Sequence, residues 1–535
     1  MDRDPISNDS ANAHFAAFLA LRSPSAIMRR RLLQVGLGSA ALSFFGLPAL
    51  AGPTGRPAIG FTPIGVASDD AVHVPDGYTV QLLFAWGDPI SNGPAFRADA
   101  GNSAAEQAEQ AGMHHDGMHF FPWVVNGQPS STHGLLCVNH EYTDDGLLHP
   151  DGMAEWSHDK ARKSQNAHGV SVVEVKLGEL AGEFRWQLVR PSAYARRITA
   201  RTPIRIAGPA AGAPGMRTRD DRRGNVVFGT LANCAMGHTP WGTYLTCEEN
   251  FNAYFNGLGE PTSDQKRYGI RANGAGFRWH EYDSRFDVAT EANEANRFGW
   301  VVEIDPWQPA QAPVKRTALG RFKHECATVV LAGDGRVVVY MSDDEAFEYL
   351  YKFVSRDRFD ASEPAAAGGR LLDVGTLYVA RFDADGKGRW LALQHGQHGL
   401  DEGSGFTDQA DILMRTRQAA DAVGATKMDR PEWLAVDPQS GDVYCTLTNN
   451  RQRLTPEPGN PRAENIFGHI LRWREAEGDA AADTLDWDVF VLAGDPENPD
   501  PARRGNSKGD AFASPDGLWF DRAGRLWIQT DVSGS

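Results

Sequence analysis

Short apolar segments separated by turn residues recur along most of the chain, and they restrict its fold more than any other feature. In residues 437–444 and 521–527 an apolar pattern is interrupted by Asp and Gly and then resumes, which is typical of a β-hairpin. The alternation within the segments favours antiparallel sheets over α/β units. The clearest predicted strands are 78–86, 134–139, 170–177, 184–189, 226–230, 242–247, 300–304, 314–321, 336–341, 349–354, 376–382, 390–394, 433–437, 443–447, 469–473, 486–492, 518–521 and 526–530.

Successive hairpins of this kind are typical of propeller blades, which repeat at roughly 40–50 residues. We therefore predict an all-β propeller in one domain, residues 52–535. Loop insertions are expected at 101–132, 252–296, 356–370 and 398–428. Residues 407–422 carry apolar side chains at helical spacing and predict a helix, and 104–110 is a weaker candidate.

Composition limits the partners of this domain. The chain has 535 residues and a net charge of −16, with no extended basic stretch beyond the N-terminal region, so nucleic acid is not expected as a partner. Five cysteines without short CxxC pairs argue against a zinc ribbon and against a complete disulfide framework. At least one thiol should therefore be free or bound to metal.

The first 51 residues read as an export signal. Arg29, Arg30 and Arg31 precede two leucines, a moderately apolar run and a small-x-small cleavage site. The paired arginines indicate the twin-arginine route, which implies the twin-arginine translocase as a transient partner and a periplasmic or extracellular location. The alternative is a membrane anchor, but Gly and Pro interrupt a run that is short for a span of about 20 residues.

One stretch, residues 233–250, combines a soft and a hard class of metal ligand. Cys234 lies in a predicted turn, and a short β pattern leads from it to the adjacent carboxylates Glu248 and Glu249. A thiolate favours a transition metal, whereas carboxylate oxygens favour Ca²⁺. The alternative is a buried cysteine followed by a solvated acidic strand end.

Further acidic residues follow other apolar strands at comparable positions. In a propeller the innermost strand of each blade lines the central channel, so one acid per blade can converge on a common point. Converging carboxylates cannot all stay ionised without cations between them. The candidates are Glu141, Glu248, Glu249, Glu325, Glu432 and Asp516.

Two further groups stand beside these candidates. Arg430 precedes Glu432 by two residues, so in an extended segment both side chains share a face, as required to bind a phosphoryl oxygen beside a metal. An ordinary ion pair is the alternative. The run Met113–His119 contains three histidines and Asp116, which is its best candidate for a metal ligand.

These motifs resemble those of the PhoX-type alkaline phosphatases, bacterial enzymes exported by the twin-arginine route. The resemblance extends over nearly the whole chain after residue 60. The matching segments are 29–30, 75–78, 86–89, 139–142, 233–235, 240–243, 247–250, 299–306, 320–325, 424–433 and 514–516.

The resemblance implies a six-bladed propeller whose channel holds Fe³⁺ and Ca²⁺ with a bridging oxo group. It implies hydrolysis of small phosphate monoesters by a protein that we expect to be a monomer without a stable membrane anchor. Cys234 would be the iron thiolate ligand, and Glu249, Glu325 and Glu432 would bind iron or calcium, joined by Glu248 and Asp516. Arg430 would bind the substrate phosphate, and no side-chain nucleophile would be needed.

The chain departs from the family pattern in two places. The run Met113–His119 is richer in histidine, and the sequence stops at Ser535 within a predicted hairpin, so we expect a C-terminally truncated last blade. Two other functions stay open. A calcium-dependent propeller lactonase also gathers carboxylates in its channel, although Cys234 and Arg430 speak against it, and a truncated propeller could be a non-catalytic binding protein.

Overall fold

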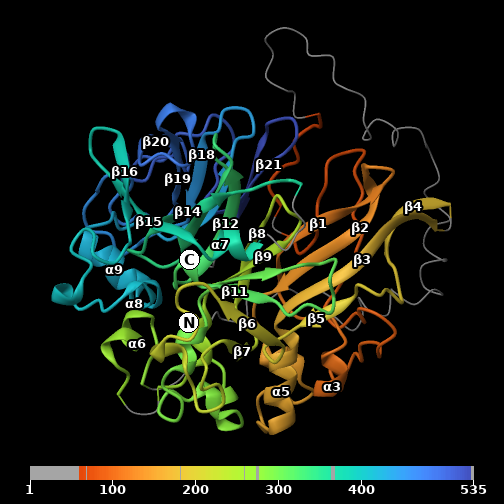
Figure 1. Cartoon of the computed structure of the whole chain (residues 1–535). Helices are drawn as coiled ribbons and strands as arrows, with labels where there is room; N and C mark the ends of the chain where they lie inside the picture. Colours follow the sequence, from red (N-terminus) through yellow and green to blue (C-terminus); the bar gives the residue numbers. More distant parts are fainter. Residues whose placement is uncertain are drawn as a thin grey trace.

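The computed structural model describes residues 60–531 except 68, 181, 258–259, 273–275 and 363–367. The predicted export signal, residues 1–51, lies outside the described residues. The described chain is a β-propeller with short helices in its loops (Figure 1).

The first two blades are formed by the N-terminal half of the chain. The first has the strand order β1-β2-β3-β4, with β5 beside β3, and the second has the order β7-β6-β11-β10-β9-β8. Their bounds are β1 His115–Val125, β2 Gln128–His140, β3 Gly169–Leu180, β4 Glu183–Leu188, β5 Arg196–Ile198, β6 Pro203–Ala207, β7 Val226–Phe228, β8 Asn233–His238, β9 Tyr244–Glu248, β10 Val301–Ile304 and β11 Val314–Arg316.

The next two blades are β12 to β16 and β17 to β20, and pairing between β16 and β20 joins them into one nine-stranded sheet. A further hairpin, β21–β22, follows. The bounds are β12 His324–Leu331, β13 Arg336–Asp343, β14 Leu350–Arg358, β15 Gly375–Phe382, β16 Lys387–Ala392, β17 Pro431–Val436, β18 Val443–Leu447, β19 His469–Glu475, β20 Thr484–Leu492, β21 Pro515–Phe520 and β22 Leu526–Thr530.

Five strands line the central channel, one from each blade or hairpin. β8 packs against β1 on one side and β12 on the other, and β17 packs between β12 and β21. The first blade (orange) and the third blade (teal) therefore lie on opposite sides of β8 and β9 in Figure 1. The described residues thus form four blades and one hairpin, and a ring of six blades stays a prediction.

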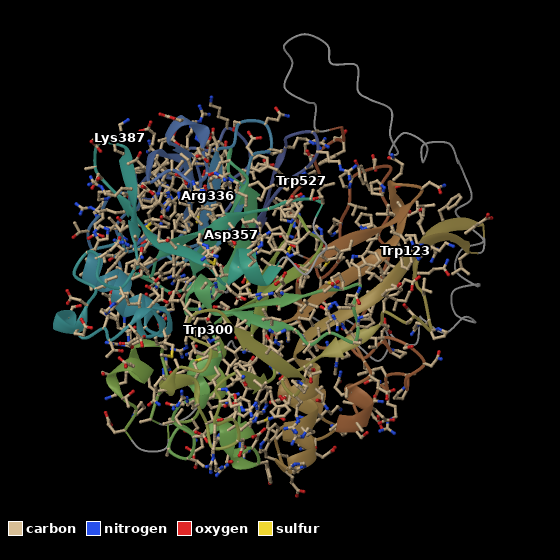
Figure 2. The ribbon with its side chains drawn as sticks, viewed as in Figure 1. Trp123, Trp300, Arg336, Asp357, Lys387 and Trp527 are labelled. Atoms are coloured by element: carbon tan, nitrogen blue, oxygen red, sulfur yellow. The ribbon has the colours of Figure 1, made fainter. Side chains whose placement is uncertain are left out.

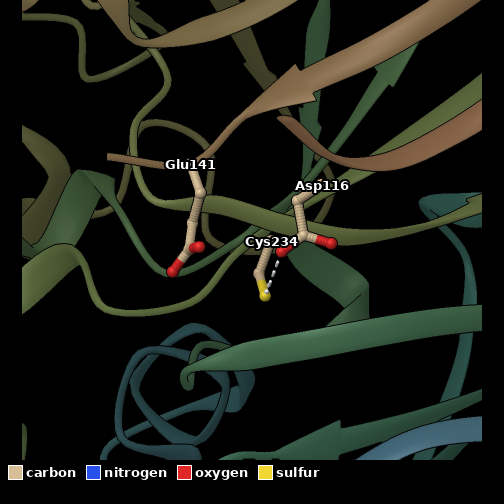
Figure 3. Close-up of side chains that lie close together, drawn as sticks. All are labelled: Asp116, Glu141 and Cys234. Carbon is tan, nitrogen blue, oxygen red and sulfur yellow. Dashed lines mark hydrogen bonds between the residues drawn. The ribbon is translucent and has the colours of Figure 1, made fainter. Parts of the chain in front are cut away.

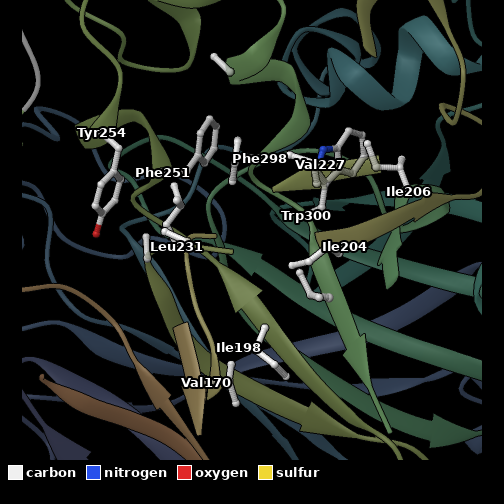
Figure 4. Close-up of a cluster of buried hydrophobic side chains, with 14 of the residues drawn as sticks. Val170, Ile198, Ile204, Ile206, Val227, Leu231, Phe251, Tyr254, Phe298 and Trp300 are labelled. Atoms are coloured by element: carbon white, nitrogen blue, oxygen red, sulfur yellow. The ribbon is translucent and has the colours of Figure 1, made fainter. Parts of the chain in front are cut away.

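Hydrophobic cores lie between the faces of consecutive blades. In β10, Val302 belongs to the core shared with the first blade, shown in Figure 4, and Val301 belongs to the core shared with the third. In β13, Val339 faces the second blade and Val338 faces the fourth. Because side chains alternate across a strand, both faces of each central sheet are buried, at about 1.5–3 kcal/mol for each aliphatic side chain. This packing fixes the inner strands around the channel.

The helices are short and lie in the insertions. The predicted helix at 407–422 is confirmed as α8 and α9, and the weaker one at 104–110 begins as α3. No helix in the described part of the chain is long and apolar enough to cross a membrane. The bounds are α3 Ala104–Gln107, α4 Asp145–Leu148, α5 His158–Ala167, α6 Ser263–Arg267, α7 Gly368–Leu372, α8 Gln409–Met414 and α9 Thr416–Val423.

The strand predicted at 78–86 is wrong, and three of the strands that line the channel are not predicted. Residues 78–86 are irregular because the side chain of Gln81, rather than the backbone, pairs with Trp186 of β4, through hydrogen bonds of 2.6 and 3.1 Å. The unpredicted inner strands are β1, β8 and β12, of which β1 runs through a predicted insertion.

Trp123 near the end of β1 and Trp527 in β22 are labelled in Figure 2.

Candidate metal centre

The same local backbone pattern begins all five inner strands. Each inner strand pairs with the next strand of its sheet, and between the first and the second residue pair the inner strand advances three residues while the other strand advances two. This irregularity is a β-bulge. A bulge changes the direction of the side chains in the bulged strand. The residue directly after the first paired residue is a metal-ligand type in every strand: Asp116, Cys234, Glu325, Glu432 and Asp516.

A second position repeats at the end of the neighbouring strand. There the backbone amide of the residue that follows the neighbouring strand donates to the carbonyl of the residue just before the first pair of the inner strand. This distance is 2.8–3.1 Å in all four blades and in the hairpin. The donors are Glu141, Glu249, Asp344, Thr448 and Asp531. Four of the five are carboxylates, so most blades present two ligand-type side chains to the same end of the channel.

These positions form three overlapping groups whose ligand atoms lie within 4.8 Å of one another. Asp116, Glu141 and Cys234 form the first group, and their side chains converge from β1, the end of β2 and β8 (Figure 3). Cys234, Glu249 and Glu325 form the second. Glu325 also belongs to the third group, together with Asp344 and Glu432.

Charge repulsion within these groups is severe unless something neutralises it. Burial, followed by the charge of Glu432, raises the pKa of Glu325 well above its ordinary value. Burial and Asp344 raise the pKa of Glu432 in the same way, and burial with Asp116 raises the pKa of Asp516 to about 7. Either protons or cations must therefore occupy the cluster.

Several features fit cations rather than protons alone. Oε1 of Glu249 and Oδ1 of Asp344 are buried and have no hydrogen-bond partner among the described residues. Buried carboxylate oxygens without partners are unfavourable, and a metal ion satisfies them. The two groups that include Cys234 join a thiol to carboxylates and suit a transition metal, whereas the third offers oxygen only and suits Ca²⁺.

Cys234 is held at the junction of the groups. Its Sγ lies 3.1 Å from Oδ2 of Asp116 and 3.2 Å from Oε1 of Glu325. Burial and the charge of Asp116 raise the pKa of this thiol well above its ordinary value, and a coordinated metal would reverse that effect by removing the proton. The other four cysteines are buried and are not joined in disulfides.

Arg430 lies at the edge of the third group. Its Nη2 is 2.7 Å from Oδ2 of Asp344 and 3.2 Å from Oε1 of Glu432, and about a third of the side chain (35%) is exposed. The charge of Asp344 raises the pKa of Arg430, so the guanidinium is permanently cationic. It therefore presents a charged, partly exposed donor beside the carboxylates.

The structure brings together most of the residues predicted from the sequence. Cys234, Glu249, Glu325, Glu432 and Arg430 meet at one end of the channel. Asp516 belongs to the same repeat and interacts electrostatically with the cluster without completing a group.

Glu248 lies elsewhere, contrary to the prediction. Its Oε1 is 2.7 Å from Nζ of the fully buried Lys315, and its Oε2 accepts the amides of Gly299 and Trp300. The reason is strand alternation, which turns Glu248 and Glu249 to opposite sides. Glu248 and Lys315 form a buried structural ion pair, and we do not retain Glu248 as a metal ligand.

Two residues of the repeat, Asp344 and Asp531, were not predicted. The sequence signal that identifies them is a carboxylate directly after the second strand, which four of the five repeats share. The histidines of the Met113–His119 run do not join the cluster: His115 packs against His140, and His119 stacks on His238. Asp116 is the member of this run that contributes.

Comparison with known proteins agrees with this architecture. The family model for alkaline phosphatase PhoX matches residues 59–535. A solved structure described as Pseudomonas fluorescens PhoX in complex with vanadate, a transition state analogue, is 48% identical, with a TM-score of 0.84. The alignment covers 88% of this chain and 83% of that one. Comparison with curated proteins gives no match. This chain belongs to the alkaline phosphatase PhoX family.

Proposed function

We infer that this chain is a phosphoric monoester hydrolase that cleaves phosphate esters at the ligand-rich end of its channel. The observation that carries this inference is the convergence of Cys234 and the carboxylates beside Arg430, in a chain whose family and similar structure are those of a phosphatase. No observation favours a lactonase or a non-catalytic binding protein.

We propose that the cluster holds iron and calcium. Cys234, with Glu249 and Glu325, supplies the thiolate and carboxylates that iron requires. Glu325, Asp344 and Glu432 supply the oxygen ligands that calcium prefers, while Asp116 and Glu141 add carboxylates beside the thiolate. When bound, these ions would place positive charge beside the phosphoryl oxygens and would favour attack by an oxygen nucleophile.

The side chains of this protein hold and orient the substrate. Arg430 donates to the phosphoryl oxygens, and its guanidinium is positioned for this by Asp344 and Glu432. Because both carboxylates also belong to the third ligand group, the phosphate-binding residue and the metal ligands share one rigid support. No side-chain nucleophile is required.

We further propose that the natural substrates are small phosphate esters in the periplasm or outside the cell. The paired arginines at residues 29–30 support export by the twin-arginine translocase, which carries folded proteins. We expect the enzyme to act as a monomer without nucleic-acid or membrane partners.

The test is hydrolysis of p-nitrophenyl phosphate at alkaline pH, with and without a chelator. We expect activity that is lost on chelation and restored by iron with calcium but not by calcium alone. Hydrolysis that persists after complete removal of the metals would contradict the metal-dependent mechanism. Hydrolysis of a lactone without any hydrolysis of p-nitrophenyl phosphate would contradict the phosphatase assignment.

A further inference from the structure

The repeat that builds the metal centre has a third position, at the edge of the channel. It is the residue whose carbonyl accepts the repeated backbone hydrogen bond, and we call it the rim position. In the four blades and the hairpin it is occupied by His114, Ala232, Lys323, Arg430 and Ser514. Lys323 therefore holds in the third blade the place that Arg430 holds in the fourth.

The two cationic rim residues are neighbours. Lys323 directly precedes β12 and Arg430 directly precedes β17, and these two inner strands pack side by side. Burial and the charge of Asp344 raise the pKa of Glu249 well above its ordinary value, and the charges of Lys323 and Arg430 both oppose this rise, so both cations act on the same part of the cluster. The backbone of Arg430 is left-handed (φ 51°), as at three other rim positions, whereas that of Lys323 is not. The shared hydrogen bond nevertheless keeps the two residues equivalent in the repeat.

The Lys323 ammonium has unused capacity to donate hydrogen bonds. Its side chain is only 7% exposed, and its one ion-pair partner among the described residues is Oε2 of Glu345, at 3.2 Å. That carboxylate is also held by Arg417, whose Nη1 lies 2.8 Å from the same oxygen. An ammonium has three donors, so this single shared partner does not satisfy it.

Metal binding makes this shortage larger. The ions that the cluster is proposed to hold would bring positive charge close to Glu249, and Lys323 acts on the same carboxylate. A buried cation beside metal ions is repelled by them unless an anion lies between. A phosphoryl group bound in front of the metals is such an anion.

Building on the proposed phosphatase function, we propose that Lys323 is a second phosphate-binding residue, which donates from the third blade to an oxygen of the ester that Arg430 binds from the fourth. Arg430 gives directional contacts through its planar fork, and Lys323 adds a compact point charge. The alternative is that Lys323 serves only to pair with Glu345.

The experiment measures the binding of inorganic phosphate and vanadate to the metal-loaded protein by calorimetry, together with iron and calcium content. The variants are Lys323→Met, Lys323→Arg and, as the matched control, Glu345→Gln, which removes the ion pair but keeps the ammonium. We expect Lys323→Met to weaken binding about 10- to 100-fold with unchanged metal content, the size expected for a charged hydrogen bond. Lys323→Arg should recover part of the loss, and Glu345→Gln should bind within about threefold of the unaltered protein.

Each other outcome decides against the proposal. Unchanged phosphate binding in Lys323→Met would overturn it, and so would an equal loss in Glu345→Gln, since Lys323 would then act only through the ion pair. Loss of iron or calcium in both Lys323 variants would also overturn it, because the residue would then support the metals rather than the phosphate. Failure of the unaltered protein to bind phosphate would instead contradict the proposed function itself.

Discussion

At the scale of single residues, the adjacent carboxylates Glu248 and Glu249 show where the sequence was informative and where it was not. The residue type correctly indicated an ionic site at the end of this strand. Strand alternation turns the two side chains to opposite sides, and which of them faces the channel depends on how β9 is placed in the packed ring, which no local pattern reveals. Lys315, the partner of Glu248, lies 67 positions further along the chain, so the pairing is set by tertiary structure.

Substitution of each carboxylate by its amide separates the two roles. We expect Glu249→Gln to bind metal at least 10- to 100-fold more weakly, since even residues that only support a metal ligand have effects of this size. The phosphatase activity should be lost together with the metal. Glu248→Gln should retain its metals but unfold more easily, by about 3 kcal/mol, because Lys315 is left buried without its counter-charge. Metal analysis and urea denaturation measure the two effects. Metal loss in Glu248→Gln with unchanged stability would show that the assignment is reversed.

At the scale of the elements, the strands that carry the ligands were the hardest to predict. Most of the other strands are predicted from their regular alternation, although β5 and β6 are missed. By contrast, β8 has the sequence Asn-Cys-Ala-Met-Gly-His, with few residues that favour strands. Small residues are needed here because inner strands of neighbouring blades approach closely. A Cβ on Gly237 of β8 would lie 1.8 Å from the carbonyl oxygen of Ala327 in β12.

This close approach predicts a marked effect of a single methyl group. Gly237→Ala should destabilise the protein by about 1–3 kcal/mol, as overpacking does, and should lower metal content by separating Cys234 from Glu325. Gly333→Ala is the matched control, because a Cβ there meets no atom within 4 Å, and its effect should stay within about 0.5 kcal/mol. Thermal unfolding and metal analysis test the pair. Equal stability of the two variants would mean that β8 and β12 are not held at this distance.

At the scale of the whole molecule, the fold class followed from the sequence but the site's organisation did not. Recurring strand and turn patterns were enough to predict a propeller, because each blade is built from local hairpins. The convergence of residues more than 300 positions apart, such as Asp116 and Glu432, at one end of the channel requires the packed ring. Metal ions bound there would join four blades, and they should therefore stabilise the entire fold.

This link has a defined dependence on pH. Without metals, Asp516 has a pKa of about 7 in the folded protein against an ordinary value of 3.8, so between about pH 4 and 7 the folded state binds more protons and loses stability as the pH rises. Bound metal ions replace those protons, so the stabilisation of the fold by the metals should increase between about pH 4 and 7. Buried histidines contribute equally to both forms and cancel in the comparison.

The corresponding measurement is the difference in unfolding temperature between metal-loaded and chelated protein at several pH values. We expect the difference in unfolding temperature to widen as the pH rises from about 4 to 7, because the pKa values of the buried carboxyl groups are raised in the metal-free folded protein. A difference that stays constant or narrows would show that cations do not neutralise these carboxylates.

We propose that the repeat shared by the four blades and the hairpin assembles a centre in which Cys234 binds iron. Iron content and visible absorption of the unaltered protein, Cys234→Ala and Cys137→Ala test it most directly, since Cys137 is buried away from the cluster. We expect Cys234→Ala to lose the iron, the iron–thiolate absorption band and the hydrolysis of p-nitrophenyl phosphate, and Cys137→Ala to keep all three. Undiminished iron and an unchanged band in Cys234→Ala would contradict it.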